Sequence, residues 1–109
     1  MTENSKILDR LYRVIESRKG KNPASSYTAH LLSRGMPEIA RKVGEEAVET
    51  VTAALSAENK HIVAESADLL FHLLVLWVEK GIKPEDVWAE LILREGTSGI
   101  EEKAERQQK

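Results

Sequence analysis

Apolar residues recur along most of the chain at the three- and four-residue spacing of an α-helix. The pattern predicts helices of unequal length, separated by breaks that contain glycine, proline, serine or asparagine. Their expected ranges are about residues 5–17, 25–35, 36–57, 60–80 and 85–94. No segment alternates apolar and polar residues in the manner of a half-buried strand. We therefore predict an all-α fold, a bundle of four to five helices.

The same stripes predict which side chains are buried. The helix at 60–80 is apolar on nearly all sides, which is typical of a buried helix. Trp77 and Trp88 are expected in the core, and Asn4 or Ser5 could cap the first helix. The other residues expected on buried faces are Ile7, Leu8, Leu11, Val14, Ile15, Leu31, Leu32, Ile39, Val43, Ala47, Val48, Val51, Ala54, Leu55, Val87, Leu91 and Ile92.

Composition adds limits to this picture. A length of 109 residues suits one domain spanning 1–109, and 41% hydrophobic with 31% charged residues is ordinary for a soluble protein. The net charge of −2 argues against nucleic-acid partners, and the absence of cysteine excludes a thiolate metal site. The N-terminus lacks the apolar core of a signal peptide, and the longest apolar run is too short to span a membrane. We expect a cytoplasmic protein, with a frayed polar tail at 95–109.

Two clusters of carboxylates interrupt the predicted helical core, one in each long helix: Glu45, Glu46 and Glu49, and Glu65 and Asp68. A helix advances by about 100° per residue, so each cluster crowds one side of its helix. The first cluster alone fits an ordinary solvated acidic face. The second lies in a helix that is otherwise almost wholly apolar, where an ionised carboxylate needs a partner, a proton or a metal. If the two helices are antiparallel, the clusters can meet, and a bound cation becomes the better interpretation.

The ligand types indicate which cation to expect. Carboxylate oxygens alone suit hard ions, so we predict Mg²⁺, with Mn²⁺ as a possible substitute. A di-iron site of the ferritin type would need two Glu-x-x-His pairs, and the chain has only Glu58 with His61. His72 is expected to be a hydrogen-bonded core residue, whereas His30 and His61 are expected to be exposed.

Residues that could bind an anion lie before and within the first long helix. Arg18, Lys19 and Lys21 form a basic loop that is either solvated or an anion-binding segment. Ser26 and Tyr27 bring hydroxyls to a helix N-terminus, where they either cap the helix or contact a ligand. Lys42 could pair with Glu46 within the helix, or it could reach a phosphate at the mouth of a metal site.

The acid spacing resembles that of the all-α nucleoside triphosphate pyrophosphatase superfamily. The blocks SSYTAHLLSRG, KVGEEAVETV and ESADLLFHLLVLW more specifically resemble the phosphoribosyl-ATP pyrophosphatases of histidine biosynthesis. The likeness covers the chain from about the first helix almost to the C-terminus. It implies hydrolysis of phosphoribosyl-ATP to phosphoribosyl-AMP and pyrophosphate, the second step of that pathway, by a nucleotide-binding homodimer.

The resemblance also implies roles for individual residues. All five acids match the family motif and would bind the metal, and Glu45 would orient or deprotonate the attacking water. The residues expected to contact the substrate are Lys42, Tyr27, Ser26, Arg18, Lys19 and Arg94. Two alternatives stay open: a house-cleaning pyrophosphatase for non-canonical nucleoside triphosphates, and a non-enzymatic helical dimer that uses the acids structurally.

Overall fold

The computed structural model describes residue 4, residues 6–56 and residues 58–96. Within these residues the chain forms helices and no strands, so the predicted all-α fold is confirmed. The helices are α2 (Ile7–Arg18), α3 (Tyr27–Arg34), α4 (Met36–Ser56), α5 (Asn59–Lys80) and α6 (Pro84–Arg94). The predicted frayed tail lies almost wholly outside the described residues, as does Ala57 at the predicted end of α4.

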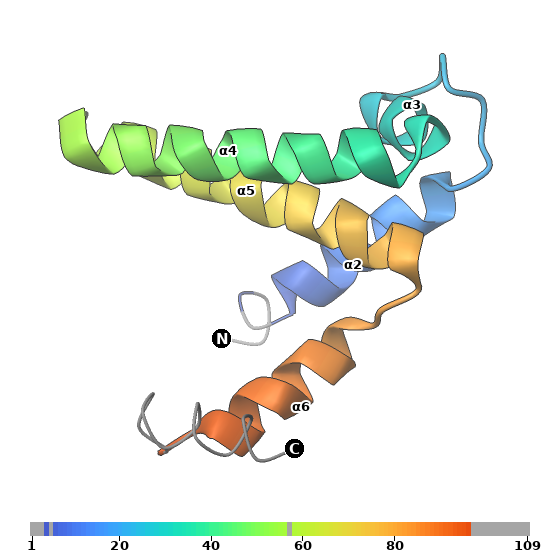
Figure 1. The fold of residues 1–109 in the computed structure, drawn as a ribbon. Coiled ribbons are helices and arrows are strands. Elements are labelled where there is room, and N and C mark those ends of the chain that lie inside the picture. The colour runs from blue at the N-terminus through green and yellow to red at the C-terminus, as the bar shows by residue number, and fades with distance from the viewer. Residues whose placement is uncertain (1–3, 5, 57, 97–109) are drawn as a thin grey trace.

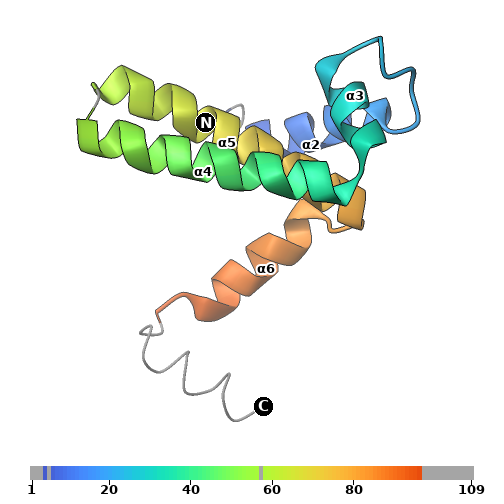
Figure 2. The ribbon, with the colours of Figure 1, turned by 45° about the horizontal axis from the view of Figure 1, so that its top comes forward.

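The two long helices, α4 and α5, form an antiparallel hairpin that dominates the molecule (Figure 1). Helix α2 packs against α5, and the short α3 packs against α4 at the open end of the hairpin. Helix α6 extends away from the hairpin in both ribbon views (Figure 2) and packs mainly against α2. One end of the hairpin is therefore covered by other helices, while the end at the α4–α5 turn projects from the rest of the molecule.

The core lies at the covered end. Its buried members come from α2, α3, the start of α4 and the second half of α5: Tyr12, Ile15, Leu31, Leu32, Ile39, Leu74, Val75 and Val78. Leu8 and Leu11 pack partly buried against this cluster, together with Trp77. The ring of Trp77 meets Trp88 of α6 edge to face, with centroids 6.0 Å apart. The predicted apolar stripes of α2 and α3 and the start of α4 are thus largely correct.

The projecting end departs from the predicted burial. On α4, the side chains of Val48, Val51 and Leu55 are exposed, and Leu55 retains 84% of its surface. On α5, Val63 and Leu70 are exposed as well. The prediction that α5 is buried on nearly all sides is wrong for one copy of the chain, because only α4 covers its first half. Val48, Val51 and Leu55 lie three and four residues apart on the side of α4 opposite Glu46, and they form an exposed apolar face of α4.

Predicted burial also fails at the outer helices. Leu91 and Ile92 of α6 were expected to face inward but are exposed, because α6 leans away from the hairpin (Figure 1). Ile7 and Val14 of α2 remain about half exposed. The predicted cap of α2 is wrong too: Lys6 occupies the N-cap position and makes no side-chain cap bond. Ser5 lies outside the described residues.

Two local features set the position of α3 beside α4. The Ser26 hydroxyl caps α3 by accepting a hydrogen bond of 3.0 Å from the Ala29 amide. Gly35 then ends α3 with a φ of 86°, a conformation that side chains rarely adopt, and α4 begins at the next residue. This tight reversal brings the start of α3 close to α4 and the second half of α5.

By length and apolar composition alone, α5 could cross a membrane. The same helix carries Glu65, Asp68 and His72 and packs against α4 and α2, as the core helix of a soluble protein does. It is weak evidence for a membrane span.

Candidate active site

The two acid clusters meet across the α4–α5 hairpin. One ligand oxygen from each of Glu45, Glu46 and Glu49 can be chosen so that all three lie within 4.8 Å of one another. The same holds for Glu46, Glu65 and Asp68. Glu46 therefore belongs to both groups and joins the acids of α4 to those of α5. A cation of the size of Mg²⁺ or Mn²⁺ needs oxygens gathered in this way.

Burial within the clusters differs from the prediction. Glu46 is only 6% exposed, Glu65 is partly buried, and Asp68 is exposed although its helix was expected to be buried. The buried residues of α4 are Ile39, Glu46 and Ala53, each seven positions after the last. This repeat follows the seam that faces α5. The seven-residue spacing from Ile39 could therefore have singled out Glu46 from the sequence.

The surroundings of Glu65 are mainly acidic. Its Oε1 atom is buried and has no hydrogen-bond partner among the described residues. Desolvation raises the pKa of the Glu65 carboxyl, and the neighbouring charges of Glu49, Asp68 and Glu46 raise it further. Such a carboxylate favours a proton or a cation. The donor set therefore fits a hard divalent metal.

Glu45 has different surroundings. Its carboxylate accepts hydrogen bonds from Lys42 Nζ at 2.8 Å and from Arg41 Nη1 at 3.0 Å. The bond from Lys42, followed by the charges of Lys42 and Arg41, lowers the pKa of Glu45. The intrahelical partner of Lys42 is thus Glu45 and not Glu46. Lys42 and Arg41 place positive charge at the edge of the acid cluster. There a polyphosphate could replace Glu45 as the anion that Lys42 and Arg41 bind.

Tyr27 and His72 link α3 to the acid-bearing helix. The Tyr27 hydroxyl lies 2.8 Å from His72 Nε2, and His72 Nδ1 lies 2.7 Å from the backbone oxygen of Asp68. His72 is buried and hydrogen-bonded on both nitrogens, as predicted, while His30 and His61 are exposed. Burial raises the pKa of the Tyr27 hydroxyl, while the Lys42 charge lowers it. Tyr27 therefore reaches the neighbourhood of Lys42 and the acids.

Comparison with known proteins identifies the family. The model of the family described as phosphoribosyl-ATP pyrophosphohydrolase matches residues 8–95. A phosphoribosyl-ATP pyrophosphatase of Paramagnetospirillum magneticum is 60% identical over 109 residues, which is 100% of both chains. The enzyme of that name from Parvibaculum lavamentivorans is 55% identical, covering 97% of each chain. That of Azospirillum brasilense is also 55% identical, covering 92% of this chain and 90% of its own.

The chain belongs to the phosphoribosyl-ATP pyrophosphohydrolase family. It is accordingly an enzyme, a hydrolase, and the alternative of a non-enzymatic helical dimer is wrong. The family match covers α2 to α6 almost completely and includes all five acids. The roles of individual residues in this member of the family stay predictions.

The structure does not gather all the cations that were expected to contact substrate. Arg18 lines a hollow of about 420 Å³ together with Lys21, Asn22, Ser25 and Ser26. Lys19 instead pairs with Glu79 of α5 at 3.6 Å. Arg94 pairs with Glu90 at 2.9 Å at the end of α6, the helix that leans away from the hairpin (Figure 2). If Arg94 contacts the acids, it must come from a second copy of the chain, or α6 must move.

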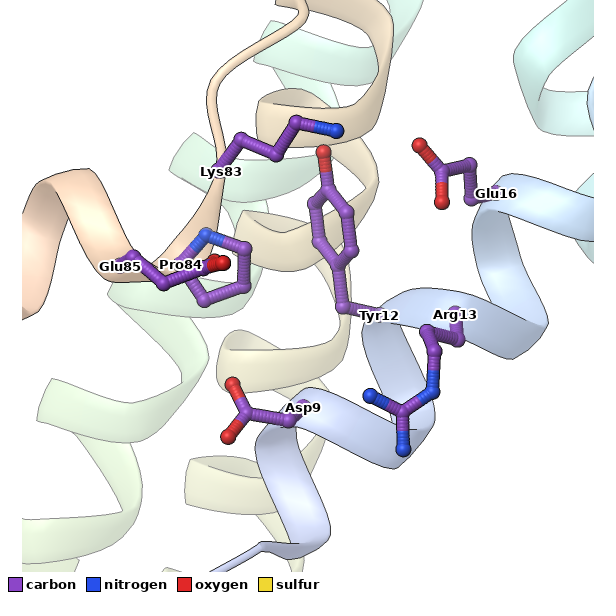
Figure 3. Close-up of a pocket in the computed structure, with 7 residues that line it drawn as sticks. All are labelled: Asp9, Tyr12, Arg13, Glu16, Lys83, Pro84 and Glu85. Atoms are coloured by element: carbon purple, nitrogen blue, oxygen red, sulfur yellow. The ribbon is translucent and has the colours of Figure 1, made fainter.

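Two further hollows differ in their relation to the acids. One of about 360 Å³ adjoins them and is lined by Glu49, Thr52, Ala53, Ser56, His61 and Glu65. Thr52 and Ser56 could not be identified from the sequence, because hydroxyl residues on a helix surface carry no distinctive pattern. The other, of about 310 Å³, lies between α2 and the start of α6 (Figure 3). There the Tyr12 hydroxyl donates to the Ile82 carbonyl at 2.7 Å, a contact that serves the core and not the acids.

Proposed function

We propose that this protein hydrolyses phosphoribosyl-ATP to phosphoribosyl-AMP and pyrophosphate in a Mg²⁺-dependent reaction, the second step of histidine biosynthesis. The relatives' names support the substrate. The observation that carries the metal dependence is Glu46, a nearly buried carboxylate shared by two groups of acids. Acids so close together, with Glu65 Oε1 lacking a partner among the described residues, favour a divalent cation over solvent.

The residues that would hold Mg²⁺ are Glu45, Glu46, Glu49, Glu65 and Asp68, and Mn²⁺ would fit the same oxygens. When bound, the metal supplies positive charge that offsets the triphosphate and polarises its phosphoryl oxygens. Glu46 and Glu65 fix the relative position of α4 and α5 around it. Glu49 and Asp68, both exposed, leave an open side through which substrate oxygens can enter.

Glu45 is the proposed residue for the attacking water. Lys42 and Arg41 lower its pKa, so Glu45 is ionised at neutral pH and can accept a hydrogen bond from water. The Glu45 carboxylate would orient the water or take up its proton. Lys42 then turns from Glu45 to a phosphate oxygen as the triphosphate arrives, which leaves Glu45 free for the water.

The substrate contacts divide between two regions. Lys42 and Tyr27 lie beside the acids and would bind the part of the nucleotide nearest the scissile bond. Ser26 and Arg18 line the adjacent hollow, and Lys19 lies in the same loop, so this loop would receive a more distant anionic group. We propose that Arg94 contributes through a partner copy.

A homodimer is part of the proposal. The exposed apolar face of α4, formed by Val48, Val51 and Leu55, supports it, because three large apolar side chains exposed on one side of a helix favour an interface. A second copy of the chain would cover it and complete the predicted bundle. We further infer cytoplasmic action without nucleic-acid or membrane partners, in keeping with the net charge of −2.

The deciding experiment measures pyrophosphate release from phosphoribosyl-ATP with Mg²⁺, beside a panel of deoxy and non-canonical nucleoside triphosphates. Much faster turnover of phosphoribosyl-ATP, abolished by EDTA and restored by Mg²⁺, supports the proposal. Faster turnover of the panel would favour a house-cleaning pyrophosphatase, which shares the acid motif. Undiminished turnover in EDTA would overturn the metal dependence.

A further inference from the structure

A chain of two hydrogen bonds fixes the direction in which the Tyr27 hydroxyl can act. The Asp68 backbone oxygen can only accept, so His72 Nδ1, 2.7 Å away, carries the imidazole proton. In the neutral imidazole His72 Nε2 is then an acceptor, and the Tyr27 hydroxyl donates to it at 2.8 Å. The single proton of the Tyr27 hydroxyl is therefore used, and only its oxygen lone pairs remain for a ligand.

The His72 ring is held in place by its surroundings. It is 6% exposed, and the rings of Tyr27 and Phe71 meet it edge on, with centroids 5.8 and 5.1 Å away. Tyr27, by contrast, is 51% exposed, so part of its side chain faces solvent at the first turn of α3. An anchored hydroxyl on a half-exposed ring is a contact point set before the ligand arrives.

The hydrogen bonds of His72 place this hydroxyl beside the acids. They join it to the backbone of Asp68, which shares an acid group with Glu46 and Glu65. The charge of Lys42 lowers the pKa of the Tyr27 hydroxyl, and the charge of Glu46 raises it. Glu46 belongs to both acid groups, and Lys42 is the proposed phosphate contact. In a ligand bound by these residues, the group attached to the phosphates would lie beside Tyr27.

We propose that His72 is a positioning residue that presents Tyr27 as a hydrogen-bond acceptor, so that Tyr27 recognises a hydroxyl or amino donor of the nucleotide and not a phosphate oxygen. Phosphate oxygens are acceptors and would meet the Tyr27 lone pairs unfavourably. The inference rests on the proposed function for the identity of the substrate. The hydrogen-bond direction itself does not depend on that function.

The test compares two substitutions of His72 with one of Tyr27. In His72→Asn, the shorter amide can still bond to the Asp68 carbonyl but does not reach Tyr27, whereas in His72→Gln the side-chain oxygen can accept from Tyr27. Tyr27→Phe removes the hydroxyl itself. Ser33→Ala, which removes an exposed hydroxyl bonded only within α3, is the matched control. Thermal unfolding in the same buffer shows that each variant is folded.

We expect His72→Asn and Tyr27→Phe each to raise KM for phosphoribosyl-ATP by about 5- to 10-fold, as expected for one neutral hydrogen bond. His72→Gln should recover most of this loss, and kcat should change by less than about threefold because the contact forms before the chemical step. The double variant that combines His72→Asn with Tyr27→Phe should be no worse than either single variant. Inhibition by pyrophosphate, which offers mainly acceptors, should be unchanged.

An independent readout follows the His72 ring nitrogens by ¹H–¹⁵N NMR. The wild type should show the Nδ1-protonated tautomer, and Tyr27→Phe should shift only the Nε2 resonance. Weaker pyrophosphate inhibition in Tyr27→Phe, in step with KM, would mean that Tyr27 binds phosphate and would overturn the inference. The inference would also be overturned if the KM increases of His72→Asn and Tyr27→Phe multiplied in the double variant. An Nε2-protonated tautomer of His72 would overturn it as well. Absence of wild-type turnover would instead contradict the proposed function, and the NMR result would still decide the hydrogen-bond direction.

Discussion

Glu46 of α4 and Glu65 of α5 approach each other across the hairpin, with a carboxylate oxygen of each within 4.8 Å of the other and of Asp68. Neither helix can move toward the other without bringing these charges closer together. Apolar contacts on either side of Glu46 therefore stabilise the hairpin, and repulsion among the acids between them destabilises it. A bound cation reverses the sign of that contribution, and this gives the first prediction.

Mg²⁺ should stabilise the folded protein, and Glu46→Gln should remove most of that effect. At a concentration 100 times the dissociation constant, a ligand that binds only the folded state adds about 2.7 kcal/mol to the free energy of unfolding. Thermal unfolding in MgCl₂ and in EDTA measures the difference. Glu95→Gln, at an exposed position beyond α6, should keep the full stabilisation. Equal melting temperatures of the wild type with and without Mg²⁺ would speak against a metal site.

The stability of the metal-free protein should depend on pH through Glu65. Because the pKa of Glu65 is raised in the folded state, folding takes up a proton between the ordinary value of 4.5 and the raised value. The free energy of unfolding therefore falls as pH rises through that window, and the loss persists at neutral pH. Glu65→Gln should remove this loss and be more stable than the wild type in EDTA at neutral pH.

Urea unfolding in EDTA at mildly acidic and at neutral pH tests the assignment. The carboxyls of Glu38 and Glu45 have lowered pKa values, so their contribution is lost below the ordinary value, in a different window. The gain from Glu65→Gln should consequently grow from the acidic to the neutral measurement. An equal gain in the free energy of unfolding at both pH values would show that repulsion of ionised Glu65 is not the source of the gain.

The exposed ligands should matter for activity more than for folding. Glu49→Gln or Asp68→Asn removes one metal oxygen from a site whose Lewis-acid contribution is several kcal/mol, so turnover should fall by about 100-fold or more. Both side chains are exposed, and the melting temperature in EDTA should not fall, because each substitution removes a charge that repels ionised Glu65. Pyrophosphate release at saturating Mg²⁺ provides the measurement. Full Mg²⁺-dependent activity in either variant would remove that residue from the site.

The sequence predicted the class of fold and the meeting of the two acid clusters well, since both depend on the spacing of residues along helices. It predicted the burial within the site less well. Asp68 lies on an apolar helix yet is exposed, because burial depends on how many neighbours cover each part of α5. Glu46 lies in a conspicuous acidic run yet is buried, because it occupies the seam that also holds Ile39 and Ala53.

The distant contacts could not be predicted at all from spacing. Tyr27 and His72 are 45 residues apart, and their hydrogen bond depends on the reversal at Gly35 that brings α3 beside the second half of α5. The pairing of Lys19 with Glu79 likewise depends on where the loop before α3 lies, whereas Arg94 pairs with Glu90 one turn away in the same helix. Short-range pattern identifies candidate residues, whereas the packing of helices decides which of them share a site.

Tyr12 should contribute to stability and not to catalysis. Its ring is 5% exposed, and its hydroxyl bonds to the Ile82 carbonyl between α2 and α6 (Figure 3). Tyr12→Phe should lower the free energy of unfolding by about 1 kcal/mol, or the melting temperature by about 5 °C. Tyr27→Phe, the other tyrosine, is half exposed and should lose less stability while raising KM. A raised KM in Tyr12→Phe at full stability would contradict this division.

The exposed apolar face of α4 should hold two copies of the chain together. Leu55 retains 84% of its surface and lies beside Val48 and Val51 on α4. A stable interface buries about 800 Å² on each partner with few charges at its centre, so Leu55→Glu should convert a dimer into a chain of 12.2 kDa. Ser33→Glu, which adds the same charge at an exposed position on α3, should leave the dimer intact. Sedimentation equilibrium gives both masses.

If the wild type sediments as a single chain, Arg94 must reach the acids of its own copy or play no part in catalysis. If the wild type sediments as a dimer, mixing Arg94→Ala with Glu46→Gln chains tests whether Arg94 reaches the acids of the partner copy, since only a shared site would regain activity in the mixed dimer.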